Sequence, residues 1–248
     1  MHSQFSVEGK VALVTGTSSG LGAHCARVLH DQGASVVGLS RSLGEFADLS
    51  LGQSAQFISV DLTEEHDWFS VVEAISVEFG TPDILINAAG VNLRKHADET
   101  SLSDWAMTVA LNLTAPFFLA QALVPPMRAK GFGRIVNFAS LQSERAFTNG
   151  LAYGATKGGV AQMTRAMAEA WSSQGVNVNA LAPGFFPTQL TEPVFSDPIA
   201  ADRFAEQTCI GRNGQMSDID GPLLFFCSDA SVYVTGQVLF IDGGFTAK

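Results

Sequence analysis

The sequence contains few cysteines and few basic residues. Its three cysteines (Cys25, Cys209 and Cys227) lie far apart and lack CxxC spacing. This pattern argues against a disulfide framework or a structural zinc site and favours buried thiols in a reducing compartment. Lysine and arginine together number 14 against 24 acidic residues, giving a net charge of −10. Nucleic acid and anionic membranes require a basic surface, so neither is expected as a partner.

The sequence also has little that predicts insertion into a membrane. The first ten residues lack an apolar core of signal-peptide length. Residues 105–127 carry no charge, but they include Asn112, Thr114, Gln121 and three prolines. These residues favour a helix buried on several sides, including at a subunit interface, over a bilayer helix. With 46% hydrophobic and 15% charged residues, the chain is interpreted as a compact cytoplasmic protein.

Apolar runs typical of strands alternate with helical patterns along the chain. Strands are predicted at 10–15, 34–40, 56–60, 84–87, 134–139, 176–181 and 238–242. The first helix is expected to end near residue 32, and a brief helix fits within 41–54. Longer helices are predicted at 64–79, 102–128, 153–174, 198–208 and 217–227, with a bend or restart at Pro125 and Pro126. This order predicts one domain over 1–248, an α/β Rossmann fold whose doubly wound, mostly parallel sheet of about seven strands has helices on both faces.

A glycine-rich turn follows the first predicted strand and opens the first helix. It reads Thr-Gly-Thr-Ser-Ser-Gly-Leu-Gly over residues 15–22, which is GxxxGxG spacing. Glycines allow the backbone to approach a pyrophosphate, whose charge then meets the helix N-terminus. A glycine trio alone is a weak signal, but the strand–turn–helix context favours nucleotide binding over a plain turn. The candidate residues are Gly16, Thr17, Ser19, Gly20, Leu21 and Gly22.

The end of the second predicted strand indicates which dinucleotide is bound. An acidic residue there would bind the adenosine ribose, but this chain has Ser40 followed by Arg41. An arginine can pair with a 2′-phosphate, so NADP is favoured over NAD, which stays open as the second cofactor. Arg41 as a solvated loop residue is the alternative. Further cofactor contacts are predicted at Asp61 and Leu62 after the third strand, and at Asn87, Ala88, Ala89 and Gly90 after the fourth.

Tyr153 and Lys157 are four residues apart at the start of a predicted helix, so they share one face. A nearby cation favours a phenolate, which would make the tyrosine useful as an acid or base near neutral pH. Ser140 follows an apolar run and can reach the same place from a strand end. A chance pair at an ordinary helix start would have the same spacing.

These motifs together resemble the short-chain dehydrogenase/reductase family. The glycine turn, Asn87-Ala-Ala-Gly90, Asn112, Ser140, Tyr153-xxx-Lys157 and Pro183-Gly184-xxx-Thr188 occur in that family's order and spacing over essentially the whole chain. The segment 233–244 is also similar. Ala88 departs from the family pattern, which more often has a second asparagine there.

The resemblance implies hydride transfer between a nicotinamide and an alcohol or ketone carbon, with no metal. It implies that Tyr153 is the acid/base, that Lys157 lowers its pKa and holds the nicotinamide ribose, and that Ser140 binds the substrate oxygen. It further implies that Asn112 fixes a water, and that Pro183, Gly184, Phe186 and Thr188 cover the nicotinamide. A homotetramer or homodimer is expected from the same resemblance.

Segments around residues 87–95, 140–145 and 179–188 are similar to the gluconate 5-dehydrogenase branch. Arg94 and Arg145 can supply a clamp for a sugar-acid carboxylate, and both can equally be solvated loop residues. Hydroxyl contacts are expected from Asn92, Ser143 and Glu144, and Gln142 is a further candidate substrate residue. A lid at about 184–212, rich in phenylalanine, fits a polyol less well and leaves open a 3-oxoacyl thioester or a bulkier ketone. A cofactor-binding sensor without turnover is a third, minor alternative.

Overall fold

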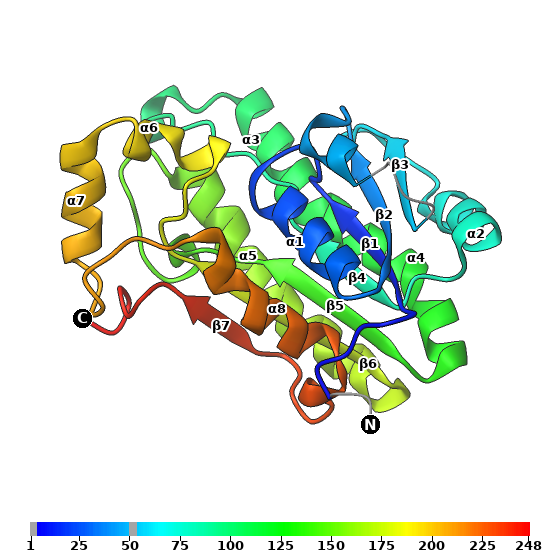
Figure 1. Ribbon diagram of the computed structural model, residues 1–248. Helices are drawn as coiled ribbons and strands as arrows, with labels where there is room; N and C mark the ends of the chain where they lie inside the picture. Colours follow the sequence, from blue (N-terminus) through cyan, green and yellow to red (C-terminus); the bar gives the residue numbers. More distant parts are fainter. Residues whose placement is uncertain (1–3, 50–53) are drawn as a thin grey trace.

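The computed structural model describes residues 4–49 and 54–248, and within them the chain forms a seven-stranded parallel sheet (Figure 1). The strand order is β3-β2-β1-β4-β5-β6-β7. The strands are β1 (Val11–Thr15), β2 (Ser35–Ser40), β3 (Ala55–Ser59), β4 (Ile84–Asn87), β5 (Gly133–Phe138), β6 (Val176–Pro183) and β7 (Val238–Ile241). The predicted doubly wound α/β fold is confirmed.

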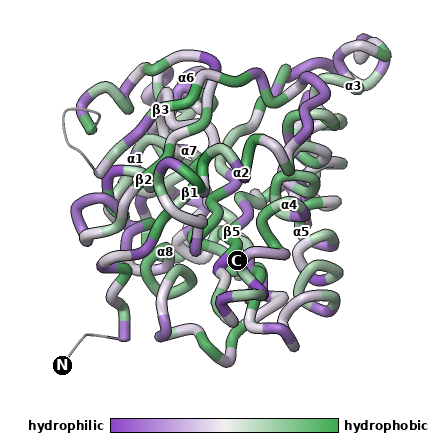
Figure 2. The backbone as a smooth tube through the Cα atoms, turned by 90° about the vertical axis from the view of Figure 1, so that its right-hand side faces the viewer, coloured by the Kyte–Doolittle hydropathy of each residue, from purple (hydrophilic) through white to green (hydrophobic). Residues whose placement is uncertain are grey.

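The central strands are buried on both faces, as their continuous apolar sequences predict. Every residue of β4, β5 and β6 is buried, and Figure 2 shows hydrophobic segments at the centre, where β1 and β5 lie. The strand order reverses between β1 and β4, where Thr15 and Asn87 are register partners at the carboxyl ends. In parallel sheets ligands bind in the crevice outside such a switch point.

Helices cover both faces of the sheet (Figure 1). On one face, α1 (Gly20–Asp31) and α8 (Asp220–Cys227) pack against the strands and each other. On the other face lie α2 (Trp68–Phe79), α4 (Ala115–Lys130) and α5 (Leu151–Trp171). The remaining α-helices are α3 (Leu102–Val109), α6 (Glu192–Phe195) and α7 (Pro198–Glu206), with short 3₁₀ turns that include Gly44–Asp48, Leu141–Ser143 and Gln189–Thr191.

The helix does not restart at Pro125 and Pro126, which was one of the two outcomes predicted there. Both prolines lie inside α4, which continues to Lys130 and ends at Gly131 in the left-handed conformation. The prolines stand near the helix end, and the last turn stays in place because Val124 and Met127 are buried against the sheet. The irregular part lies earlier instead, in a π-helical turn at Ala110–Thr114 between α3 and α4.

The helical run Leu102–Lys130 is long and apolar enough to cross a membrane by length and composition. Half of its most apolar window is buried inside the protein, and α4 packs on α2, β5 and β6. The core helix of a soluble protein gives the same result, so this run is weak evidence for a membrane span.

The helix predicted from residue 64 begins later, at Trp68. Asp67 caps it by accepting a hydrogen bond from the Ser70 amide. The residues before the cap are held by Asp61, whose carboxylate accepts bonds from the amide and hydroxyl of Thr63. These side-chain bonds compete with helix formation and move its start.

Candidate active site

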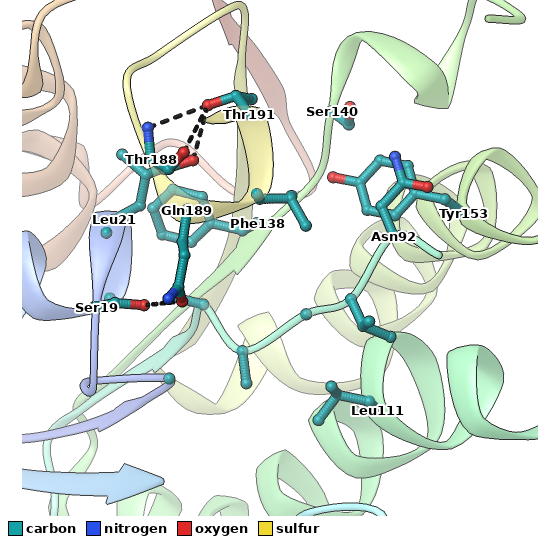
Figure 3. A pocket seen from close by; sticks show the side chains of 18 of the residues that line it. Ser19, Leu21, Asn92, Leu111, Phe138, Ser140, Tyr153, Thr188, Gln189 and Thr191 are labelled. Carbon is teal, nitrogen blue, oxygen red and sulfur yellow. Dashed lines mark hydrogen bonds between the residues drawn. The ribbon is translucent and has the colours of Figure 1, made fainter. Parts of the chain in front are cut away.

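A cavity of about 740 Å³ lies outside the carboxyl ends of the central strands. It extends from the glycine turn after β1, past Tyr153 on α5, to the segment 183–194 after β6 (Figure 3). Its size is typical of a site for a small molecule or cofactor.

The glycine turn forms one end of the cavity. Gly16 has φ +75°, and a Cβ there would lie 2.8 Å from Ala89 Cα, so no larger residue fits. Ser19 precedes α1 but makes no side-chain cap, so the positive end of this 12-residue helix is uncapped by its own side chain. Gly16, Ser19, Gly20, Leu21 and Gly22 all line the cavity. This cradle fits the pyrophosphate of a dinucleotide.

The segment after β6 lies over this turn. The Ser19 hydroxyl donates to Gln189 Oε1 at 3.3 Å (Figure 3). A Cβ on Gly20 would lie 3.3 Å from Thr188 Cβ. The predicted covering residues Pro183, Gly184, Phe186 and Thr188 all line the cavity.

The adenosine end contains the predicted pair Ser40 and Arg41, both of which line the cavity. Ser40 is buried and donates its hydroxyl to the Ser42 carbonyl at 2.7 Å, whereas Arg41 is exposed. Asp61 and Leu62 line the same end. The pKa of Asp61 is lowered by its bonds to Thr63, with a smaller effect from Arg41, so a carboxylate stands near this guanidinium.

Two predicted cofactor residues do not line the cavity. The Thr17 hydroxyl is buried without a hydrogen-bond partner, and the side chain is fully buried. Asn87 is turned into the sheet, where its amide donates to Asn137 Oδ1 at 2.9 Å. The residues after it, Ala88, Ala89 and Gly90, do line the cavity. The structure therefore indicates that Thr17 and Asn87 support the residues that line the cavity and do not themselves line it.

Thr15 was not among the predicted site residues, yet it holds the loop that follows β4. Its hydroxyl oxygen accepts hydrogen bonds from the amides of Ala88 and Ala89, both at 3.1 Å. A threonine at the end of a first strand gives little sequence signal for this role, because the bond spans more than 70 residues of chain.

Tyr153 and Ser140 meet in the middle of the cavity (Figure 3). Burial raises the pKa of Tyr153, while the hydrogen bond with Ser140 and the charge of Arg94 lower it. The expected lowering by Lys157 is not found among these causes. The burial effect is the largest of these, so the phenol favours its protonated form.

Lys157 lies beneath Tyr153, with Nζ 5.5 Å from the centre of the tyrosine ring. The side chain is 5% exposed, and its ammonium donates to the Phe138 carbonyl at 2.5 Å. Burial lowers the pKa of Lys157 from 10.5 to about 8. The lysine is therefore mostly charged at pH 7 but close to titration.

Asn112 lies in the π-helical turn, a type of irregularity that is frequent at functional sites. Its Oδ1 accepts from the Val91 amide at 2.8 Å, and its amide donates to the Val91 carbonyl and the Thr156 hydroxyl. Both amide hydrogens are thus used, and Oδ1 retains capacity for one more donor. A Cβ on Gly90 would lie 3.3 Å from this oxygen and 3.8 Å from Lys157 Nζ.

Of the residues predicted to bind a sugar acid, some line the cavity and others do not. Arg94 lines the cavity, has φ 53° and donates to the Leu190 carbonyl at 3.0 Å. Gln142 also lines it, and its buried Oε1 has no partner. Asn92 lines the cavity and points into it in Figure 3.

Ser143, Glu144 and Arg145 do not line the cavity. The Ser143 hydroxyl donates to the Lys157 carbonyl at 2.8 Å, Glu144 is exposed, and Arg145 donates to the carbonyls of Thr246 and Lys248. The predicted two-arginine clamp is therefore wrong in this geometry, because only Arg94 of the pair faces the cavity.

Three phenylalanines line the substrate side: Phe147, Phe185 and Phe204. Phe185 was predicted as part of an apolar lid, and Phe204 lies within the predicted lid range 184–212, but neither Phe204 nor Phe147 was singled out as a site residue. In the described part of the chain, no group of three or more histidine, cysteine, aspartate or glutamate side chains is arranged to hold a metal ion.

Comparison with known proteins extends these observations. The family model described as Enoyl-(Acyl carrier protein) reductase matches residues 16–246. The gluconate 5-dehydrogenase of Gluconobacter oxydans (strain 621H) is 39% identical over 98% of this chain and 97% of its own. The 2-dehydro-3-deoxy-D-gluconate 5-dehydrogenase of Pseudoalteromonas atlantica is 34% identical over the full length of both chains.

One solved structure is similar to this chain over nearly its whole length. The gluconate 5-dehydrogenase from Burkholderia cenocepacia J2315, in complex with NADP and tartrate, superposes with a TM-score of 0.93. It is 35% identical, and the match covers 99% of this chain and 98% of that one.

Proposed function

The chain belongs to the short-chain dehydrogenase/reductase family, and on this premise we propose that it is an NADP-dependent dehydrogenase of a sugar acid. The reaction would move a hydride between the nicotinamide and a secondary alcohol or ketone carbon. The observation that carries the proposal is the meeting of Tyr153 and Ser140 above the buried Lys157, next to the glycine cradle.

NADP, when bound, supplies the hydride acceptor, and the residues of this chain hold it and manage the proton. The glycine turn and the N-terminus of α1 would hold the pyrophosphate, and Arg41 would pair with the 2′-phosphate. The NADP-bound relative supports this cofactor choice. Lys157 would hold the nicotinamide ribose.

Tyr153 would take the proton from the substrate hydroxyl during oxidation and return it during reduction. Ser140 would hydrogen-bond the same oxygen and keep it at the phenol. Asn112 would hold the loop at Val91 and, through its remaining acceptor capacity, one water near Lys157.

A sugar acid is supported by Arg94, which faces the cavity as a cation able to bind a carboxylate in two-point fashion. The relatives named for gluconate and the relative with bound tartrate, a hydroxy acid, support the same class. Gln142 and Asn92 would bind hydroxyl groups.

A second candidate is a 3-oxoacyl thioester or a bulkier ketone, favoured by Phe147, Phe185 and Phe204 on the substrate side of the cavity. A panel of sugar acids, polyols, bulky ketones and an acyl thioester, assayed with NADPH and NADH in parallel by the absorbance of the reduced nicotinamide, separates the two. Turnover of the ketones or the thioester but of no sugar acid would refute the sugar-acid proposal.

We further propose that the chain is a single domain in which residues 184–212 form the substrate lid, and that it works in the cytoplasm. Exposed apolar side chains on the run 102–130 and at the start of α5, namely Trp105, Met107, Phe118 and Leu151, favour pairing of these helices between copies in a homotetramer or homodimer. Light scattering tests this assembly, and the mass of a monomer would refute it.

A further inference from the structure

Phe245 touches both sides of the substrate end of the cavity without lining it. Its side chain is 4% exposed. The ring stacks on Phe147, with centroids 6.2 Å apart, and lies tilted against Phe185 at 5.9 Å. Phe147 belongs to the loop after Ser140, and Phe185 belongs to the segment after β6. Phe245 therefore packs against two chain segments that line the substrate end of the cavity.

Phe147, Phe185 and Phe204, here called the aromatic wall, form one packed group. Phe185 stacks on Phe204 of α7, with centroids 3.9 Å apart, and Phe147 meets Phe185 edge-on at 6.1 Å. Aromatic pairs of this kind hold one another in defined orientations. A residue that shifts Phe147 and Phe185 therefore shifts the whole aromatic wall.

The segment that carries Phe245 is tightly held. The Asp242 carboxylate accepts from the amides of Gly244 and Thr246 at 2.9 Å and from the Thr246 hydroxyl at 2.7 Å. The Gly243 carbonyl accepts from the Cys209 amide at 2.8 Å. This pairing joins the segment to the end of the proposed lid.

Two cations connect this segment to other parts of the chain. Arg145 donates to the carbonyls of Thr246 and Lys248 and lies 5.7 Å from the centre of the Phe245 ring. Lys248 donates to the Glu206 carbonyl at 2.7 Å, in the last turn of α7. The loop after Ser140, the segment 243–248 and the lid helix are thereby linked.

We propose that Phe245 determines the shape of the substrate end of the cavity by positioning Phe147 and Phe185, and that Arg145 holds it there. Both are positioning residues. This inference rests on the proposed function, because it takes the cavity beside Tyr153 as the place where the substrate binds.

The variant Phe245→Leu removes the ring contacts and leaves Phe147 and Phe185 free to shift into the vacated space. Displacement of the wall raises KM for the accepted substrate about tenfold, since small misplacements weaken productive binding. The affinity for NADP, measured by direct titration, stays within about twofold of wild type, because the cradle is at the other end of the cavity.

Phe226→Leu is the matched control. Phe226 is 2% exposed on α8, packs on Phe225 and does not line the cavity. It undergoes the same substitution in an equally buried place, so thermal unfolding reports a comparable loss of stability. Its KM remains that of wild type, which separates positioning from general destabilisation.

The role of Arg145 is tested with two substrates of similar shape, a sugar acid and the matching polyol without the carboxylate. Arg145→Met raises KM for both by the same factor, and Arg145→Lys recovers part of the loss. An effect on the acid alone would make Arg145 a carboxylate ligand and overturn this part of the inference. Arg203→Met, which removes an exposed cation from α7, leaves KM unchanged.

If Phe245→Leu keeps the wild-type KM and substrate ranking, the inference fails while the proposed function stands. If wild type turns over nothing in the panel, the proposed function fails, and amide hydrogen exchange of the NADP-loaded protein tests the inference. Faster exchange at 145–148 and 198–210 in Phe245→Leu than in Phe226→Leu supports the positioning role. Equal exchange in the two variants overturns it.

Discussion

Replacing Lys157 by methionine is expected to abolish turnover and, at neutral pH, to stabilise the folded protein. Methionine keeps most of the buried stem and removes the ammonium. Lys157 is 5% exposed, and burial lowers the pKa of its ammonium from 10.5 to about 8. This lowering of the pKa means that, below pH 8, burying the charged ammonium reduces the free energy of unfolding by roughly 3 kcal/mol.

Loss of the hydrogen bond to the Phe138 carbonyl destabilises the folded variant. A bond from a charged donor contributes about 1.5–3 kcal/mol, so the net gain of the variant at pH 7 is on the order of 1 kcal/mol. The pH dependence separates the two effects. Between pH 8 and 10.5 the unfolded wild-type chain holds more protons than the folded one, so wild-type stability rises with pH relative to the variant.

The assay is urea unfolding of wild type and Lys157→Met at pH 7, 9 and 10, at one protein concentration. We expect the unfolding free energy of wild type minus that of the variant to increase by roughly 2–3 kcal/mol from pH 7 to pH 10. A difference that stays constant from pH 7 to 10 would show that Lys157 keeps an ordinary pKa in the folded protein, and the burial argument would fall.

Three further substitutions test the site. Tyr153→Phe should lower kcat by about 10²–10⁴-fold, because the proton is lost while the ring remains, and should leave NADP affinity nearly unchanged in a fluorescence titration. Turnover near the wild-type rate would contradict the acid/base role. Arg41→Ala should raise KM for NADPH about tenfold and KM for NADH little, and equal changes would contradict pairing with the 2′-phosphate. Arg94→Met should raise KM for a sugar acid about 10–100-fold and for a polyol much less, as steady-state kinetics would show.

The fold, and the position of Ser140, Tyr153 and Lys157 at one cavity, could be predicted because most of their signals are local. Strands buried on both faces have continuous apolar sequences. Helical spacing puts Tyr153 and Lys157 on one face, and the glycine turn, Asn112 and Ser140 in family order single the pair out from a chance one. The glycine turn is similarly local, since its GxxxGxG spacing stands between a predicted strand and a predicted helix.

The substrate side could not be predicted from the same information. Arg94 and Arg145 are both arginines in polar loops, and only the folded backbone decides which faces the cavity. Arg94 itself adopts a positive φ, which is unusual for a residue other than glycine. Arg145 bonds to the carbonyls of Thr246 and Lys248, about 100 residues later in the chain, and a short-range sequence pattern cannot predict such contacts.

The position of Arg94 has a consequence for the pH dependence of the reaction. Its charge lowers the pKa of Tyr153, and a substrate carboxylate bound to it would offset that charge. The phenol pKa would then be higher with a sugar acid bound than with the matching polyol, so oxidation of the acid should need a higher pH. Profiles of kcat against pH for the two substrates measure this separation, and Arg94→Met should remove it. Coincident profiles in wild type would mean that the substrate carboxylate does not bind at Arg94.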